Sequence, residues 1–232
     1  MEFANDVSIT YVMAGLARDL EPPHEQRLLE WLEHSDRSGM PVDPRLWSQG
    51  PIRSTYPACM AVKAATEQGS AATARYLRAV REGLMCFRRK LDSTEALAGE
   101  AQGAGLDEAR FRLDLASNAT VEAFGADLEA LRALDVERAP LPSYEVGPVR
   151  LFGPQPYDRL RAAALEAGAQ PSNGPAPDVL TALGFFGRMA GVEVQAVCDL
   201  PGPRANAELW RLATEWRVKP VRVLTGMLWE LA

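Results

Sequence analysis

The chain has 232 residues, with 25 basic and 31 acidic side chains and a formal net charge of −6. Hydrophobic residues make up 47% of it, which is typical of a globular protein with a core of ordinary size and argues against general disorder. The acidic balance argues against a general nucleic-acid binder, because neutralising phosphates requires a basic surface. No apolar run approaches the ~20 residues of a membrane span, and the acidic start does not look like a secretory signal.

Cysteines and histidines are few and scattered. Cys59, Cys86 and Cys198 stand far apart and form no Cys-x-x-Cys pair, so they make a poor disulfide framework. A reducing cytosol is the simplest setting for such a chain, and we expect a cytoplasmic protein. His24 and His34 match no zinc pattern. We therefore expect no metal, no cofactor and no catalytic triad that needs a placed histidine.

The first third of the chain predicts a strand, a helix and a loop. Residues 7–13 are β-branched and aromatic with alternating polarity, which is typical of a strand. Residues 21–35 carry apolar side chains among charges after two prolines, which indicates a short amphipathic helix. Residues 38–51 are rich in glycine and proline and predict a loop.

The middle of the chain predicts a bundle of helices. Residues 56–90 follow a long alanine-rich helical pattern that Gly69 and Ser70 break into two helices. Ser93 is a good cap for the next helix, and two further helices follow, the last over about 121–134.

Strand signals return after residue 138. Residues 143–146 and 149–152 flank Gly147 and Pro148 and predict a hairpin, with a helix over 157–167 after it. Residues 169–177 are dense in proline and glycine and predict a linker. Residues 178–232 predict three helices and then a hairpin, which is the element order of a winged helix.

The winged-helix-like region does not favour DNA binding. Residues 178–232 hold six basic and six acidic side chains, so their net charge is zero. DNA affinity depends on positive charge, so we expect this region to contact protein instead.

Three segments together resemble the DsbA/FrnE family of thioredoxin-fold proteins. They are Tyr11-Val-Met-Ala-Gly-Leu16, Ser38-Gly-Met-Pro-Val-Asp-Pro44 with Trp47, and the stretch from Ser54 through Tyr-Pro-Ala-Cys to Ala65. The resemblance covers roughly residues 1–168 and implies a thioredoxin sheet with a helical domain inserted at about 22–138. The fold class expected is therefore α/β and mostly helical, with a winged-helix-like domain added at 178–232.

The chain departs from this family in its redox segment. The family begins with a strand and a helix that opens with the Cys-x-x-Cys pair, and this sequence has no counterpart of either. The segment is either lost or omitted from the sequence given. We expect the missing central strand to be replaced by direct pairing of residues 7–13 with 143–146, or by a second chain, since an unpaired apolar edge favours association. The second alternative implies a possible homodimer.

The resemblance also implies a binding groove but no catalytic residue. The family places a cis-proline just before the hairpin, where Leu141, Pro142 and Ser143 lie, and the backbone there pairs with an extended substrate. Arg53, Tyr56 and Cys59 lie in or next to the third of these segments and are candidates for the wall of the groove. Each candidate also has an ordinary structural alternative. Pro142 could simply form a turn at the start of a strand, and Ser54 or Thr55 could cap the next helix. All three cysteines could pack in the core.

Three functions remain open for the chain. The family's activity is thiol–disulfide oxidation or isomerisation, but without the cysteine pair this chain is expected to be redox-inactive. The alternatives are a non-catalytic adaptor and a transferase or isomerase that uses a thiol cofactor. The expected partner is accordingly a thiol-containing protein or a small thiol.

Overall fold

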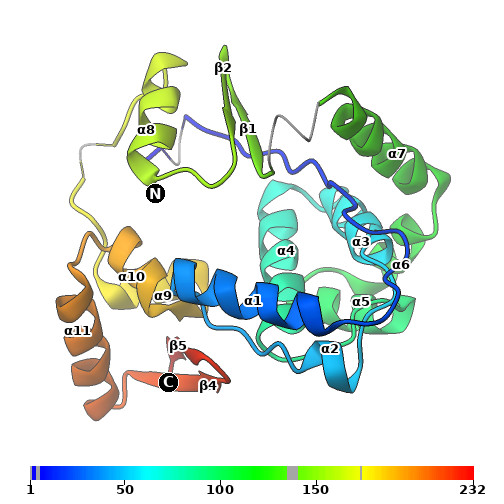
Figure 1. The fold of residues 1–232 in the computed structure, drawn as a ribbon. Coiled ribbons are helices and arrows are strands. Elements are labelled where there is room, and N and C mark those ends of the chain that lie inside the picture. The colour runs from blue at the N-terminus through cyan, green and yellow to red at the C-terminus, as the bar shows by residue number, and fades with distance from the viewer. Residues whose placement is uncertain (1, 4–5, 135–140, 173) are drawn as a thin grey trace.

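The computed structural model describes residues 2–3, 6–134, 141–172 and 174–232 and is a mostly helical α/β structure (Figure 1). Helices α1 to α7 precede a hairpin, β1–β2, and helix α8. Their bounds are α1 Glu25–Ser38, α2 Leu46–Gln49, α3 Tyr56–Thr66, α4 Ser70–Met85, α5 Thr94–Gly103, α6 Glu108–Leu115, α7 Asn118–Ala133, β1 Ser143–Val146, β2 Val149–Phe152 and α8 Tyr157–Glu166. The predicted helical bundle, hairpin and following helix are therefore confirmed.

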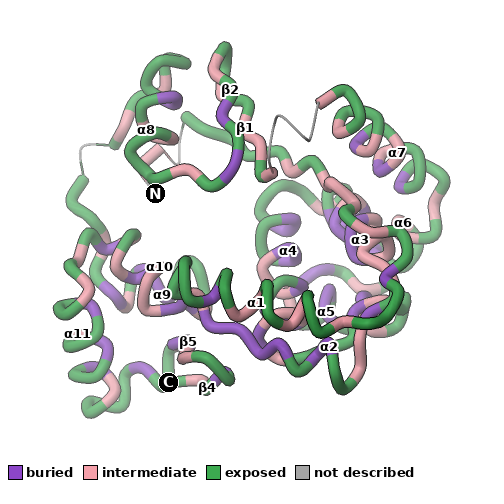
Figure 2. The backbone as a smooth tube through the Cα atoms, in the orientation of Figure 1, coloured by how far each residue is buried: buried purple, intermediate pink, exposed green. Residues whose placement is uncertain are grey.

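The helices α3 to α6 enclose the largest apolar cluster among the described residues, and Figure 2 marks buried residues along α3 and α4. Alanines on α3 and α4 let these helices approach closely, so that Tyr76 and Phe111 fill the centre with ring centroids 5.0 Å apart. The buried Tyr76 hydroxyl donates to the Leu97 carbonyl at 3.0 Å, which satisfies its only polar group. Gly69, with φ +96°, separates α3 from α4 as the sequence predicts.

The hairpin β1–β2 is antiparallel, with Val146 opposite Val149 and Ser143 opposite Phe152. Its turn needs glycine, because Gly147 has φ +57° and an added Cβ would come 2.8 Å from the Cβ of Ala167, just beyond α8. Figure 1 shows the hairpin and α8 set apart from the helical bundle, with the N-terminal segment running between them.

The strand predicted over residues 7–13 is wrong. The structure gives these residues no regular secondary structure, and β1 pairs with β2 alone in the part of the chain that is described. The expected direct pairing with residues 143–146 does not occur there. The β-branched pattern predicted a strand, but a strand forms only where a neighbour supplies backbone hydrogen bonds. Tyr11 and Met13 instead pack as partly buried side chains on the bundle.

The C-terminal region has the order of elements that the sequence predicts, with one short strand added. Its elements are α9 Val179–Phe186, β3 Met189–Ala190, α10 Gly191–Val197, α11 Gly202–Thr214, β4 Val218–Val223 and β5 Gly226–Leu231. The strands form one antiparallel sheet in the order β3-β5-β4.

This sheet is covered on both faces. Met189 and Trp229 face the helices α9 to α11, whereas Val223 and Leu228 pack on Cys86 near the end of α4. The alternation along each strand places the two sets on opposite faces. The sheet is therefore the middle layer between its own helices and the helical bundle.

Polar contacts also join the C-terminal region to the bundle. Arg78 on α4 forms a two-pronged ion pair with Glu193 on α10, and Arg188 bridges Glu82 at 2.9 Å and Glu230 at 2.6 Å. Within the described ranges, no helix has both the length and the apolarity needed to cross a lipid bilayer.

Candidate protein-binding site

The three cysteines are all buried and none forms a disulfide, as the core-packing alternative predicts. Burial raises the pKa of each thiol, in the case of Cys86 to about 11. A thiolate is the reactive form, so neither Cys59 nor Cys86 has the exposure or the lowered pKa of a redox cysteine. The Cys86 thiol donates to the Pro41 carbonyl at 3.2 Å inside the interface with the C-terminal sheet.

Tyr56 and Cys59 lie together, in a packed cluster and not in an open groove. They stand one turn apart on α3, and the Tyr56 ring meets Phe124 of α7 edge-on with centroids 5.0 Å apart. Gly15, with φ +54°, fits between these helices, where an added Cβ would come 2.8 Å from Phe124 and 3.1 Å from Tyr56. The cluster therefore anchors the N-terminal segment to the bundle.

A buried ion pair completes this anchor. Asp127 of α7 accepts the Met13 N–H at 2.8 Å and pairs with Lys63 of α3 at 3.0 Å. Both side chains are nearly inaccessible to water, so each charge depends on the other for stabilisation. Sequence reasoning did not find this pair, because two charged residues 64 positions apart carry no local signal.

Arg53 occupies a different place. Its side chain is exposed, while its carbonyl accepts the Leu20 N–H at 2.9 Å and its N–H donates to Asp92 at 3.0 Å. The expected capping is only partly correct: Ser54 accepts the Tyr56 N–H at 3.1 Å, but the Thr55 hydroxyl exchanges hydrogen bonds with Ala17 instead of capping α3.

The segment before β1 has the geometry that the resemblance implies. The Leu141–Pro142 bond is cis, Pro142 is exposed, and Leu141 and Ser143 are half-buried. No hydrogen bond or ion pair between described residues joins this segment to Arg53, Tyr56 or Cys59. The described hydrogen bonds and ring contacts therefore do not join the six predicted site residues into one site.

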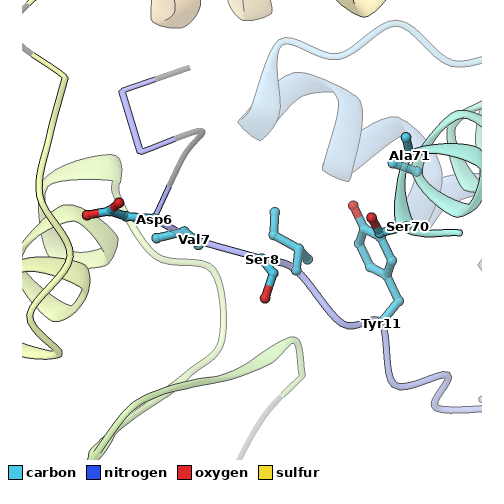
Figure 3. Close-up of a pocket in the computed structure, with 8 residues that line it drawn as sticks. Asp6, Val7, Ser8, Tyr11, Ser70 and Ala71 are labelled. Carbon is cyan, nitrogen blue, oxygen red and sulfur yellow. The ribbon is translucent and has the colours of Figure 1, made fainter.

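An open hollow of about 590 Å³ lies between the N-terminal segment and the start of α4 (Figure 3). Its lining is Asp6, Val7, Ser8, Ile9, Tyr11, Ser70, Ala71 and Ala74. Figure 3 shows the Tyr11 hydroxyl directed toward Ser70 on α4. Among the described residues no group of three or more metal-ligating side chains converges, here or elsewhere. The lining mixes apolar groups, hydroxyls and the Asp6 carboxylate.

Arg81 stands further along α4, at helical spacing from Ala74. Its side chain is exposed, and no described carboxylate forms an ion pair with it. It is a candidate binding residue that the sequence pattern did not single out.

Trp216 lies at the surface. The helical spacing of residues 205–217 predicts Trp216 in the core, but α11 ends at Thr214 and the Trp216 side chain is 87% exposed with φ +58°. Trp210 is half-exposed and packs edge-on against Trp229 with ring centroids 5.0 Å apart.

Residues 1–142 match the family model described as thioredoxin. A ClpXP adapter protein SpxH of Shouchella clausii is 30% identical over 227 residues, covering 94% of this chain and 72% of that one. The protein of the same name from Halalkalibacterium halodurans is 29% identical over 207 residues, covering 86% and 67%. A crystal structure from Nitrosomonas europaea, assigned provisionally as a protein disulfide isomerase, superposes with a TM-score of 0.56 at 20% identity and covers 66% of this chain and 78% of its own.

Proposed function

Because the chain belongs to the DsbA-like family of thioredoxin-fold proteins, we propose that it uses this fold as a binding surface and acts as an adaptor that delivers a client protein to a ClpXP protease. The observation that carries the proposal is the similarity to ClpXP adapter proteins over 86% to 94% of the chain. A protein that works by binding needs a shaped surface but no reactive thiol.

The chemistry of the cysteines supports this proposal. Dithiol exchange needs two neighbouring thiols, one of them a thiolate at neutral pH. The three cysteines of the sequence stand far apart, and all are buried with raised pKa values.

The second candidate is the family's thiol–disulfide oxidation or isomerisation. It is favoured by the fold of the solved structure from Nitrosomonas europaea, whose provisional assignment is disulfide isomerase. In that case Leu141, Pro142 and Ser143 would bind an extended thiol-containing protein, or a small thiol would occupy the groove beside them. We expect no turnover of dithiols by this chain, and turnover that depends on Cys59 would favour this second function.

The C-terminal region is proposed to be a winged-helix-like domain, 178–232, joined by a linker at 169–177 to the domain of residues 1–168. The element order and the sheet order β3-β5-β4 support that description. The tip of its β4–β5 hairpin contacts the rest of the chain: Thr225 accepts the Val42 N–H at 2.8 Å and shares a hydrogen bond with Ser35 at 2.9 Å. A wing held in this way is not free to enter a DNA groove, which favours protein contact in a cytoplasmic adaptor.

The test is a degradation assay with purified ClpXP and a soluble cell extract as the pool of clients. Quantitative proteomics would follow each protein over time, with and without the chain. We expect a small set of proteins to be degraded at least about tenfold faster with the chain present, since adaptors raise the local concentration of client at the protease. Unchanged rates for every protein, together with reduction of insulin by the chain, would contradict the proposal.

A further inference from the structure

A small hollow of about 210 Å³ lies between α2 and the turn that follows α4. Its lining is Leu46, Gln49, Gly50, Phe87, Arg88 and Lys90. Figure 1 shows α2 on the side of the molecule away from both marked ends of the chain. The lining holds two cationic side chains and one amide, but no acidic side chain. Hydrogen-bond donors in this composition indicate an anionic ligand.

Arg88 is held in place by two neighbours. Its Nε lies 3.2 Å from an oxygen of the Asp43 carboxylate, and its Nη1 donates to the Gln49 Oε1 at 2.5 Å. Its Nη2 forms no hydrogen bond with another described residue. Because a guanidinium is planar, fixing two of its nitrogens also fixes the third. Arg88 therefore presents a preformed donor, which loses little conformational entropy when a ligand binds.

Gln49 and Lys90 supply further donors. Because the Gln49 Oε1 accepts from Arg88, the Nε2 of the same amide is left with no partner among the described residues. The Lys90 ammonium lies 4.0 Å from an Asp92 oxygen, which already accepts the Arg53 N–H at 3.0 Å. So long an ion pair with an exposed lysine contributes little, and the Lys90 ammonium is available to a ligand.

The charges around the hollow do not cancel. Arg45 and Arg88 both pair with the single carboxylate of buried Asp43, at 2.5 Å and 3.2 Å. These three groups leave one positive charge uncompensated, while Lys90 and Asp92 contribute one charge of each sign. This local excess of positive charge occurs in a chain whose formal net charge is −6. It attracts an anion to this hollow in particular.

The turn after α4 brings Arg88 to the hollow. Arg88 has φ +54°, a left-handed conformation in which a residue with a Cβ is strained. Glycine would relieve the strain but would supply no guanidinium, and strained residues cluster at ligand sites. The carbonyls of Glu82 and Gly83 accept backbone N–H groups of the turn itself, and Arg89 pairs with Glu100 at 3.0 Å. The turn thus adds positive charge while the last carbonyls of α4 are occupied.

We propose that this hollow binds the phosphate group of a phosphate monoester. Its three donor side chains match the three terminal oxygens of that group, whereas a carboxylate has only two. Leu46 and Phe87 add apolar atoms to the lining, which suit the carbon atoms that carry the phosphate. A phosphorylated metabolite and a phosphorylated side chain present the same chemistry. The site does not depend on the adaptor function proposed above.

The probe is phenyl phosphate, titrated into the full chain and followed in two-dimensional proton–nitrogen NMR spectra at pH 7.5. We expect saturable chemical-shift changes centred on residues 49–50 and 87–90. Phenyl sulfate has nearly the same shape but carries one negative charge where the phosphate carries close to two. It should therefore bind at least about fivefold more weakly.

Charge-removing substitutions test the two cations. Arg88→Gln should weaken the binding of phenyl phosphate at least about tenfold, and Lys90→Gln at least about threefold. Arg132→Gln is the matched control, because it removes the same charge from an exposed position on α7 and should change the affinity by no more than about twofold. Asp43 keeps Arg45 as its partner in Arg88→Gln, and the NMR spectra would verify that each variant is folded.

No saturable change at about 10 mM phenyl phosphate, equal affinity for phenyl sulfate, or equal weakening by Arg88→Gln and Arg132→Gln would overturn the proposal. A polyalanine peptide with one phosphotyrosine distinguishes the two sources of the phosphate. Binding at least about tenfold tighter than that of phenyl phosphate would support the site with a protein ligand. Equal or weaker binding of the peptide, beside saturable binding of phenyl phosphate, would support the site with a small-molecule ligand.

Discussion

At the scale of single residues, burial governs the reactivity of the three cysteines. Cys86 is the clearest case, because burial between α4 and the C-terminal sheet raises its pKa from 9.0 to about 11. A thiol with a higher pKa in the folded state ionises first in the unfolded chain as the pH rises. Its ionisation then favours the unfolded state and lowers the free energy of unfolding. Stability from Cys86 is therefore present below pH 9 and is lost as the pH rises toward 11.

The corresponding prediction concerns thiol labelling. At pH 8, iodoacetamide should modify Cys59, Cys86 and Cys198 at least about a hundredfold more slowly in the folded chain than in the chain unfolded by guanidinium, because all three are buried with raised pKa values. Mass spectrometry of tryptic peptides would measure each rate. Rapid labelling of Cys59 in the folded chain would contradict the assignment of that thiol to the core.

At the scale of elements, the N-terminal segment is held by side chains in place of strand pairing. Asp127→Asn should keep the acceptor for the Met13 N–H but leave Lys63 buried and unpaired, at a cost of about 3 kcal/mol in the free energy of unfolding. Urea denaturation would measure the change. Glu129→Gln is the control on the same helix, since its pairing with Arg132 is exposed and should contribute little. Equal effects of the two substitutions would show that the Lys63 contact is not a stabilising anchor.

The same segment shows what the sequence could and could not predict. The helices, the two hairpins and the glycine break at residue 69 follow from local periodicity and turn chemistry, and the structure confirms them. The strand over 7–13 failed because its pattern describes the segment alone, whereas strand formation depends on a distant partner. Lys63 and Asp127 could not be found for the same reason, since their pairing comes from tertiary proximity.

At the scale of the whole molecule, the C-terminal sheet and the helical bundle share one interface. Leu228 is fully buried in it, together with Cys86 and Val223. Leu228→Ala should therefore lower the free energy of unfolding of the entire chain by about 3 kcal/mol. Leu231→Ala, on the same strand but 44% exposed, should cost much less.

Unfolding should also be one cooperative transition. Tryptophan fluorescence, which reports all five tryptophans and among them Trp229 in the C-terminal core, and helical circular dichroism should give coincident urea curves. Two separated transitions would show that residues 178–232 fold independently of the bundle.

The central claim is that this thioredoxin fold delivers a client by binding it, without thiol chemistry. The most direct measurement compares client degradation by ClpXP in the presence of the unaltered chain and of a chain carrying Cys59→Ala, Cys86→Ala and Cys198→Ala, after circular dichroism has shown that both are folded. The account predicts the same acceleration from both chains. Loss of acceleration in the folded cysteine-free chain would contradict it.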